Sequence, residues 1–266
     1  MQASIWSEPP TIYMDTWALN LFSNDQLWRS KFFELFRNRG TLAVSLLNIV
    51  EIGAHAARCR PELRSFLDAI GPHWVPLTID SFALMDAQKT SHEDKSACLS
   101  TPFLLEYFSS NRGDLSLVRL VDWTRGDAGA ELKAADRSSI ICEGIKHWRR
   151  EYAADIQTVD AKWELLPFDC RAPMRPIYNA FLRFCIKDNF EFTEHDARDL
   201  QHAIASVGCA DMTLLDNRWA AQARKVQKQT KMPKQFVRIY ESRRLPQFLA
   251  DLAEYSPSRG LCAPPI

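Results

Sequence analysis

The hydrophobic pattern of this chain is similar near its two ends and different in the middle. Near both ends, short apolar runs alternate with segments in which apolar residues recur every three or four positions. The runs predict buried strands, and the recurring positions predict amphipathic helices. The strands are expected at Thr11–Met14, Thr41–Leu46, His73–Thr78, Met212–Leu215 and Gln235–Tyr240.

The predicted helices fall between these strands. In the first part of the chain they are Trp17–Phe36, a helix from Asn48 that carries Glu51, Pro61–Ile70, and a helix that begins at Asp80. In the last part they are Glu194–Val207, which is expected to end before Gly208, Arg218–Lys228 and Pro246–Tyr255. This alternation predicts a three-layer α/β/α fold with a mainly parallel central sheet.

Residues 89–189 interrupt the alternation. Two polar, turn-rich stretches precede sequence with mainly helical periodicity, the longest piece at Glu131–Asp160 and another at Pro176–Lys187. We therefore expect an α/β core built from residues 1–88 and 190–266, with a mainly helical insertion at residues 89–189.

Charge adds a local feature to this picture. The chain has 33 basic and 33 acidic residues, so its total charge does not indicate a general nucleic-acid binder. Residues 218–244, however, contain nine basic residues and the single acid Glu241. This run is either a solvated face or a phosphate-binding flank, and Arg218 and Lys225 are its candidate phosphate contacts.

Cysteine content and hydropathy indicate the cellular compartment in which the protein is expected. The seven cysteines are scattered and form no C-x-x-C pair, which argues against a disulfide framework or a cysteine zinc site and favours a reducing compartment. The longest apolar run, at residues 42–50, is far shorter than the roughly 20 residues needed to cross a bilayer. The N-terminus shows no signal-peptide pattern. We expect a soluble cytoplasmic protein with no membrane partner.

Four carboxylates stand where a parallel sheet would bring them together. Asp15 and Asp216 follow predicted strands, and ligands of such sheets bind at the carboxyl ends of the strands. Glu51 lies in an early helix and Asp199 at the start of a late one. Several converging oxygen ligands are what Mg²⁺ or Mn²⁺ requires. Asp196 lies three residues before Asp199 on the same helical face and could take its place.

The segments around these acids resemble the three acidic motifs of PIN domains. They read TIYMDTWALN, AVSLLNIVEIGAHAA and DLQHAIASVGCADMTLLDNRW, and the resemblance covers roughly residues 10–88 and 190–255. Matched motif by motif, the family's acidic positions are Asp15, Glu51, Asp199 and Asp216. The resemblance implies a PIN-like fold and a four-carboxylate site that binds Mg²⁺ or Mn²⁺ and hydrolyses RNA, or in some members DNA, which here could be single-stranded. Because the family includes toxin ribonucleases, it also implies an antitoxin protein or a homodimer as possible partners.

Three functions are open on these grounds. The first is a metal-dependent endoribonuclease, in which metal activates water for attack on a phosphodiester. The second is a catalytically inactive PIN-like protein that binds RNA or a partner. The third is an aspartyl phosphotransferase or phosphatase of the haloacid-dehalogenase kind. It is disfavoured because that chemistry needs a second Asp two residues after Asp15, where Trp17 stands.

Several polar residues near the acids have either a site role or an ordinary structural one. Thr16 follows Asp15, Ser45 and Asn48 precede Glu51, and His202 lies three residues after Asp199. Each could contact the site, and each could equally serve the local fold.

Overall fold

A five-stranded sheet forms the centre of the computed structural model, which describes residues 9–36, 40–55, 61–78, 80–90, 116–123, 137–153 and 155–256. The strand order is β3-β2-β1-β4-β5, and every strand pairing in these described ranges is parallel. The strands are β1 (Thr11–Met14), β2 (Thr41–Ser45), β3 (Trp74–Leu77), β4 (Met212–Leu214) and β5 (Arg238–Tyr240). The expectation of an α/β protein with a parallel sheet is confirmed.

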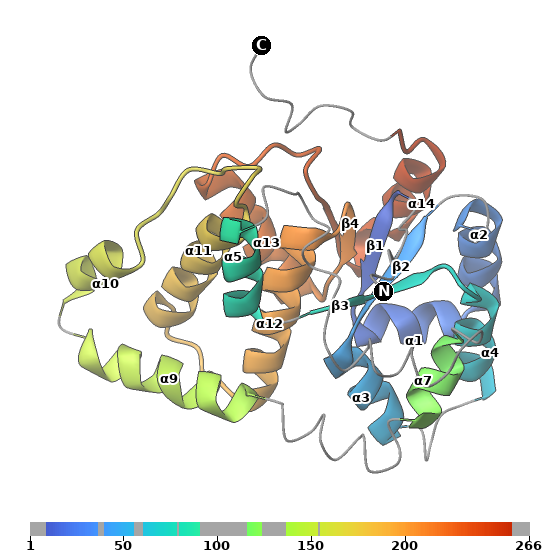
Figure 1. Ribbon diagram of the computed structural model, residues 1–266, viewed down its shortest axis with the longest axis horizontal. Helices are drawn as coiled ribbons and strands as arrows, with labels where there is room; N and C mark the ends of the chain where they lie inside the picture. The colour runs from blue at the N-terminus through green and yellow to red at the C-terminus, as the bar shows by residue number, and fades with distance from the viewer. Residues whose placement is uncertain are drawn as a thin grey trace.

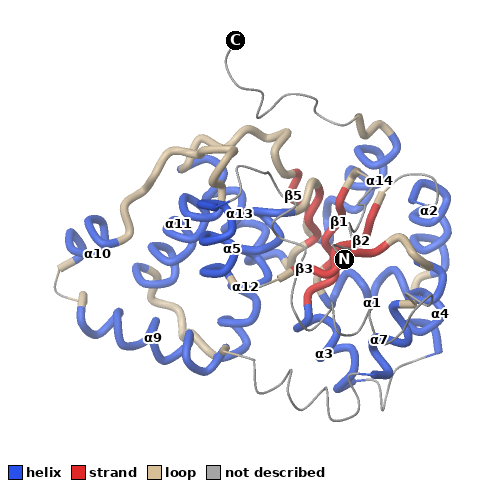
Figure 2. Tube along the Cα trace, in the orientation of Figure 1, coloured by secondary structure: helices blue, strands red, loops and turns tan. Residues whose placement is uncertain are grey.

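Helices lie on both sides of this sheet, as Figures 1 and 2 show. On one side are α1 (Thr16–Asn24), α2 (Gln26–Phe36), α3 (Leu46–His55), α4 (Pro61–Ile70), α7 (Leu117–Trp123) and α14 (Leu245–Ala253). On the other are α5 (Ser81–Thr90), α9 (Ser138–Glu151), α10 (Ile156–Lys162), α11 (Met174–Lys187), α12 (Glu194–Cys209) and α13 (Asn217–Gln229). A short 3₁₀ turn, η3 (Ser242–Arg244), precedes α14.

Strand residues divide between two hydrophobic cores, one on each face of the sheet. Tyr13 of β1 packs with α9, α11, α12 and α13, whereas its neighbours Ile12 and Met14 pack with α1, α2, α4 and α14. In β2, Ala43 belongs to the same core as Tyr13, and Leu42 belongs to the same core as Ile12 and Met14. Because successive side chains of a strand point to opposite faces, each strand is buried on both sides. This explains why the strands read as continuous apolar runs.

Two predicted helices are each broken by an aspartate. The expected helix Trp17–Phe36 is divided into α1 and α2 at Asp25, whose carboxylate accepts from the backbone of Leu27 at 3.0 Å and Trp28 at 3.1 Å. In the same way Asp155 accepts from Gln157 and Thr158 and starts α10 as a helix separate from α9. An aspartate that caps a new helix offers the backbone an alternative to continuing the old one. Residues 131–136 of the second predicted helix lie outside the described residues.

Gly208 does not end its helix, contrary to expectation. α12 continues to Cys209, and a Cβ added at Gly208 would lie 2.2 Å from the Sδ of Met174. The glycine therefore permits close approach of α11 to α12 instead of terminating the helix. The last strand is also shorter than predicted, because residues 234–236 form a turn before β5.

The described elements between residues 89 and 189 are helices, as expected. They share the two cores described above: α7 packs against α3 and α4, and α11 packs against α12 and α13. The division into a core and an insertion stays a prediction, since these helices are continuous with the packing on either side of the sheet.

The described residues include one paired cysteine and three free ones. Cys209 is disulfide-bonded, whereas Cys142, Cys170 and Cys185 are free thiols. One paired cysteine among the described ones does not amount to a disulfide framework, which the sequence argued against. In the described ranges, no helix is long and apolar enough to cross a membrane.

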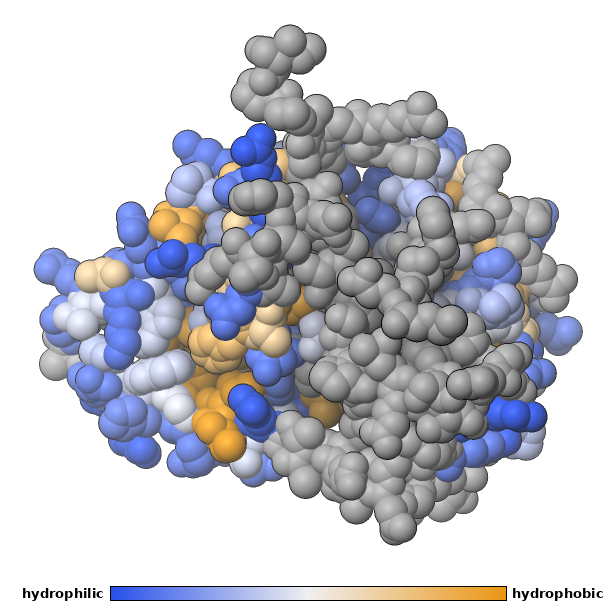
Figure 3. Space-filling view, in the orientation of Figure 1, coloured by the Kyte–Doolittle hydropathy of each residue, from blue (hydrophilic) through white to orange (hydrophobic). Residues whose placement is uncertain are grey.

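Apolar side chains gather on one face near α9, where Figure 3 shows an orange area. They line a cleft of about 320 Å³ between α5, α9, α11 and α12. Phe82 and Ile140, which line this cleft, are 60% and 70% exposed. Exposed apolar side chains that gather in this way are typical of contact surfaces.

Candidate functional site

The candidate site lies where the strand order reverses. β1 pairs with β2 on one side and with β4 on the other, and Asp15 directly follows β1. Asp216 lies two residues beyond Leu214, the last residue of β4, and the backbone N–H of Asp15 donates to the carbonyl of Leu214 at 3.0 Å. The carboxyl ends of strands at such a reversal are the usual ligand position in open parallel sheets.

Asp15 is held at the start of α1. It is the N-cap of that helix, and its Oδ1 accepts from the backbone N–H of Thr16 at 2.7 Å. Burial and the negative charges of Asp199, Glu51 and Asp216 raise the pKa of Asp15 to about 7, although the hydrogen bond from Thr16 opposes this. Asp15 is therefore in an environment that disfavours its charged form.

Asp199 lies in the second turn of α12, not at the helix start that was expected. Its Oδ2 accepts from the indole Nε1 of Trp219 at 3.2 Å and lies 3.6 Å from Nε2 of His195. Burial raises the pKa of Asp199 to about 6, with further contributions from Asp216 and Glu51, while His195 and Trp219 act in the opposite direction.

Glu51 and Asp216 each have a donor of their own. The Oγ1 of Thr16 donates to Oε2 of Glu51 at 2.6 Å, which ties α3 to the start of α1. Asp216 caps α13, and its Oδ1 accepts from the backbone N–H of Trp219 at 2.8 Å. Both acids are therefore oriented by hydrogen bonds to elements that follow strands of the sheet.

The four predicted acids thus interact electrostatically although they come from segments up to two hundred residues apart. In the described part of the chain, no lysine or arginine forms an ion pair with Asp15, Glu51 or Asp216. A search of those same residues also finds no three carboxylate, imidazole or thiol groups close enough to form a ready-made metal cluster. Like charges repel, and each carboxylate is held by its own donor, so the site is rich in carboxylates without being preassembled.

Asp196 has a different role from Asp199. It forms a capping box with Thr193 at the start of α12 and an ion pair with Arg218, whose Nη1 lies 2.6 Å from Oδ1. Burial raises the pKa of Asp196, but hydrogen bonds from Thr193 and the charge of Arg218 outweigh it and lower the pKa below its ordinary value. Of the two candidates, Asp199 is the one whose charge raises the pKa of Asp15.

A buried polar network lies beneath the acids. The hydroxyl of Tyr13 is 2.5 Å from Nδ1 of His202, and the hydroxyl of Ser45 is 3.2 Å from the same nitrogen. Ser45 donates to Oδ1 of Asn48 at 3.0 Å, and Nδ2 of Asn48 donates to Thr16 at 3.4 Å. Through Thr16 the network reaches Glu51, so it links α12 to α3 across the sheet.

Arg218 and Lys225, the predicted phosphate contacts, lie on α13 rather than among the acids. The guanidinium of Arg218 lies 3.6 Å from the ring centroid of Phe190, besides its ion pair with Asp196. Lys225 lies about two turns further along, with Nζ 5.9 Å from the ring centroid of Phe184. Neither side chain makes an ion pair with the four acids in the described structure.

Much of the basic run after Asp216 is neutralised locally. Arg224 and Arg244 both pair with Glu241, the latter at 3.3 Å, and Arg238 lies 3.8 Å from Asp251. These arginines fasten α13, β5 and α14 together. Arg218 is likewise paired with Asp196, so Lys225 is the predicted phosphate contact for which the described residues show no ion pair.

Three residues in contact with the site were not singled out in the sequence. Trp219 donates to two of the acids, Tyr13 pairs with His202, and His195 lies one turn before Asp199. The four-residue spacing of His195 and Asp199 was a usable signal. No sequence pattern indicated Trp219 or Tyr13, because their roles depend on how the helices pack. No protein-family model matches this sequence, and neither a curated protein nor a solved structure is similar to it.

Proposed function

We propose that this chain is a metal-dependent nuclease of PIN-like architecture that hydrolyses phosphodiester bonds of RNA. The observation that carries the proposal is the convergence of Asp15 and Asp216 at the switch point of the sheet, with Asp199 and Glu51 near enough to raise the pKa of Asp15. Carboxylates that repel one another destabilise the folded protein, and such groups are typical of cation-binding sites and active sites.

The donor set suits a hard divalent cation. Asp15, Glu51, Asp199 and Asp216 offer carboxylate oxygens, which Mg²⁺ and Mn²⁺ prefer. A cation held by these residues would relieve the repulsion that now raises the pKa values of Asp15 and Asp199. When bound, the metal supplies Lewis-acid activation of the phosphodiester.

The chain's own groups divide the remaining work. Thr16 orients Glu51, and Trp219 orients Asp199 and Asp216. One of the four carboxylates would orient the attacking water or accept its proton. The proposal therefore assigns both the metal ligands and the proton acceptor to these four acids.

Substrate and partners follow from the resemblance and not from the geometry. RNA is the proposed substrate, with single-stranded DNA as the alternative. An antitoxin protein, a second copy of the chain and a cytoplasmic location stay predictions. The exposed apolar cleft beside α9 is the surface that best suits a protein partner.

A catalytically inactive PIN-like binding protein is the second candidate. It is favoured by the lack of a ready-made metal cluster among the described residues. An inactive protein would use the same scaffold to bind RNA or a partner without needing the acids to share a cation.

Cleavage of a structured RNA by the purified protein separates the two candidates. The reaction is run with Mg²⁺, with Mn²⁺ and with chelator, for the wild type, Asp199→Asn and the control Glu194→Gln. Glu194 lies on the same helix and is exposed. We expect metal-dependent cleavage by the wild type and the control, and loss by Asp199→Asn. Cleavage that survives in Asp199→Asn, or none by the wild type under any condition, would contradict the nuclease.

A further inference from the structure

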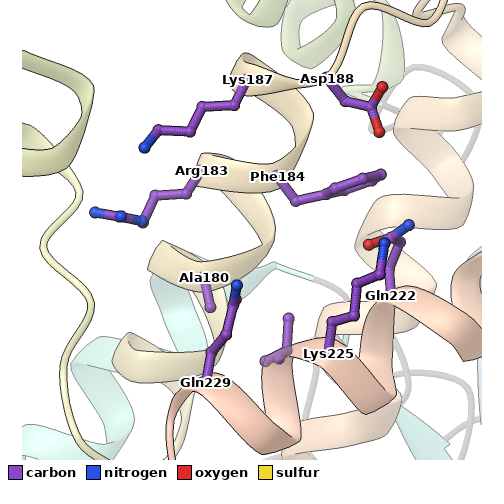
Figure 4. A pocket seen from close by; sticks show the side chains of 9 residues that line it. Ala180, Arg183, Phe184, Lys187, Asp188, Gln222, Lys225 and Gln229 are labelled. Carbon is purple, nitrogen blue, oxygen red and sulfur yellow. The ribbon is translucent and has the colours of Figure 1, made fainter. Parts of the chain in front are cut away.

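A groove with basic walls lies between α11 and α13 (Figure 4). Its volume is about 320 Å³. Figure 4 shows Lys225, Gln222 and Gln229 rising from α13, and Phe184 projecting from α11 above the ends of Lys225 and Gln222. Its charged lining residues are the cations Arg183, Lys187 and Lys225 and the carboxylate Asp188.

The three cations differ in how they are held. Arg183 and Lys187 both bind Asp160 of α10, and the Nη2 of Arg183 lies 2.8 Å from its Oδ1. Their charges are therefore fixed and partly neutralised. No described carboxylate forms an ion pair with Lys225, whose Nζ lies beside the ring of Phe184. Lys225 is the cation of the groove that can neutralise an incoming anion.

An aromatic wall connects this groove to the candidate active site. The ring of Phe184 stacks on Phe190 with centroids 5.8 Å apart, and the guanidinium of Arg218 lies over the ring of Phe190. Phe184 also lies edge-on to Trp219 at 6.4 Å, and Trp219 donates to Asp199. Phe184 and the buried Trp219 therefore connect the groove to Asp199 through packed aromatic side chains.

The same face of α13 presents a row of polar groups. Arg218, Gln222, Lys225 and Gln229 are spaced by four, three and four residues, which places them along one side of the helix. The row is about 16 Å long at 1.5 Å per residue. It starts two residues after Asp216, the acid that caps α13.

We propose that this groove binds single-stranded nucleic acid that extends away from the candidate active site, with Lys225 on a phosphate and Phe184 against a base or sugar. Cations that alternate with aromatic faces are the usual way to hold a single strand without reading its sequence. A volume of about 320 Å³ suits a nucleotide-sized group better than a duplex. The identity of the ligand rests on the proposed function, which this inference deepens.

Binding without cleavage tests the groove. A fluorescent single-stranded uridine oligonucleotide is titrated with the full chain in chelator, using wild type, Lys225→Gln and Lys228→Gln. Lys228 is exposed on the same helix but does not line the groove, so it is the matched control. We expect Lys225→Gln to weaken binding about fivefold and to lower the salt slope by about 0.7, with Lys228→Gln within about twofold of wild type. Unchanged affinity in Lys225→Gln, or tighter binding of a duplex of the same sequence, would overturn the proposal.

A parallel experiment separates failure of the groove from failure of the nuclease. Asp199→Asn should bind the oligonucleotide at least as tightly as the wild type, because it removes a negative charge near the strand. If Lys225→Gln binds the oligonucleotide more weakly while the wild type cleaves no RNA in Mg²⁺ or Mn²⁺, the groove proposal is supported and the nuclease proposal is contradicted. If the wild type cleaves RNA and Lys225→Gln matches it in affinity and KM, the groove proposal is contradicted and the nuclease proposal is supported.

Discussion

The indole Nε1 of Trp219 lies 3.2 Å from Oδ2 of Asp199, and the backbone nitrogen of the same tryptophan lies 2.8 Å from Oδ1 of Asp216. One buried residue of α13 therefore orients two carboxylates that belong to different elements. The packing of α13 against α12 sets how these acids face each other, so the tryptophan is a positioning residue for the candidate site.

Replacement of Trp219 by Phe tests this relationship. The ring is retained, but the donor to Asp199 is lost, and removal of that bond should also raise the pKa of Asp199 further. We expect the Mn²⁺ concentration for half-maximal activity to rise roughly 10-fold or more, as for other groups that orient metal ligands. The readout is a metal titration of cleavage rate. A loss of thermal stability with an unchanged metal requirement would show that Trp219 is needed for packing alone.

Thr16 offers a second test, with a conservative rescue. Thr16→Val keeps the shape of the side chain but removes the donor to Glu51. We expect kcat to fall by about 10-fold or more. Thr16→Ser restores the hydroxyl and should recover most of the activity. Equal rates for the Val and Ser variants would contradict the role of this hydrogen bond.

The raised pKa values predict an unusual dependence of stability on pH. The pKa of Asp15 is about 7 in the folded protein and that of Asp199 about 6, both above their ordinary value of 3.8. Between pH 4 and pH 7 the folded state therefore binds more protons than the unfolded state, and stability falls as pH rises through this window. We expect the metal-free protein to gain stability from these two groups when the pH is lowered from 7.5 to 5.5, measured by urea unfolding.

Asp15→Asn is the control for this effect. Asparagine can still cap α1, but it cannot ionise. The variant should be more stable than the metal-free wild type at pH 7.5 by roughly 1–3 kcal/mol, and its stability should depend less on pH. A variant less stable than the wild type at pH 7.5 would show that the charge of Asp15 is already compensated.

The overall layout was predictable because it rests on local signals. Apolar runs that end at Asp15 and near Asp216 marked β1 and β4, and a parallel sheet brings their ends together. The helix breaks at Asp25 and Asp155 were not predicted, although each aspartate caps the helix that follows it. Apolar periodicity alone does not show where a capping residue ends one helix and starts another.

Tertiary contacts explain what could not be predicted. Gly208 is read from sequence as a helix stop, yet its lack of a side chain accommodates Met174 of another helix. Trp219 and Tyr13 contact site residues from elements that are adjacent in space but not in sequence. The motif match already favoured Asp199 over Asp196, and the contacts with Thr193 and Arg218, which hold Asp196 in a cap and an ion pair, could not be predicted.

Two glycines provide a matched test of the helix packing. Gly208→Ala should destabilise the protein by about 1–3 kcal/mol, because the new methyl group meets buried Met174. Gly144→Ala, in the middle of α9, adds a methyl group with nothing within 4 Å. It should stabilise the protein by about 0.5–1 kcal/mol through its higher helix propensity. Thermal unfolding of both variants checks the pair, and similar effects of the two changes would refute the close α11–α12 contact.

Calorimetric titration with Mn²⁺ at pH 7.5 tests the central claim that Asp15, Glu51, Asp199 and Asp216 act together on one cation. The wild type and the surface control Glu194→Gln should show saturable binding, and Asp15→Asn should show little or none. Binding that is equal in all three proteins, or absent from the wild type, would contradict a shared metal site.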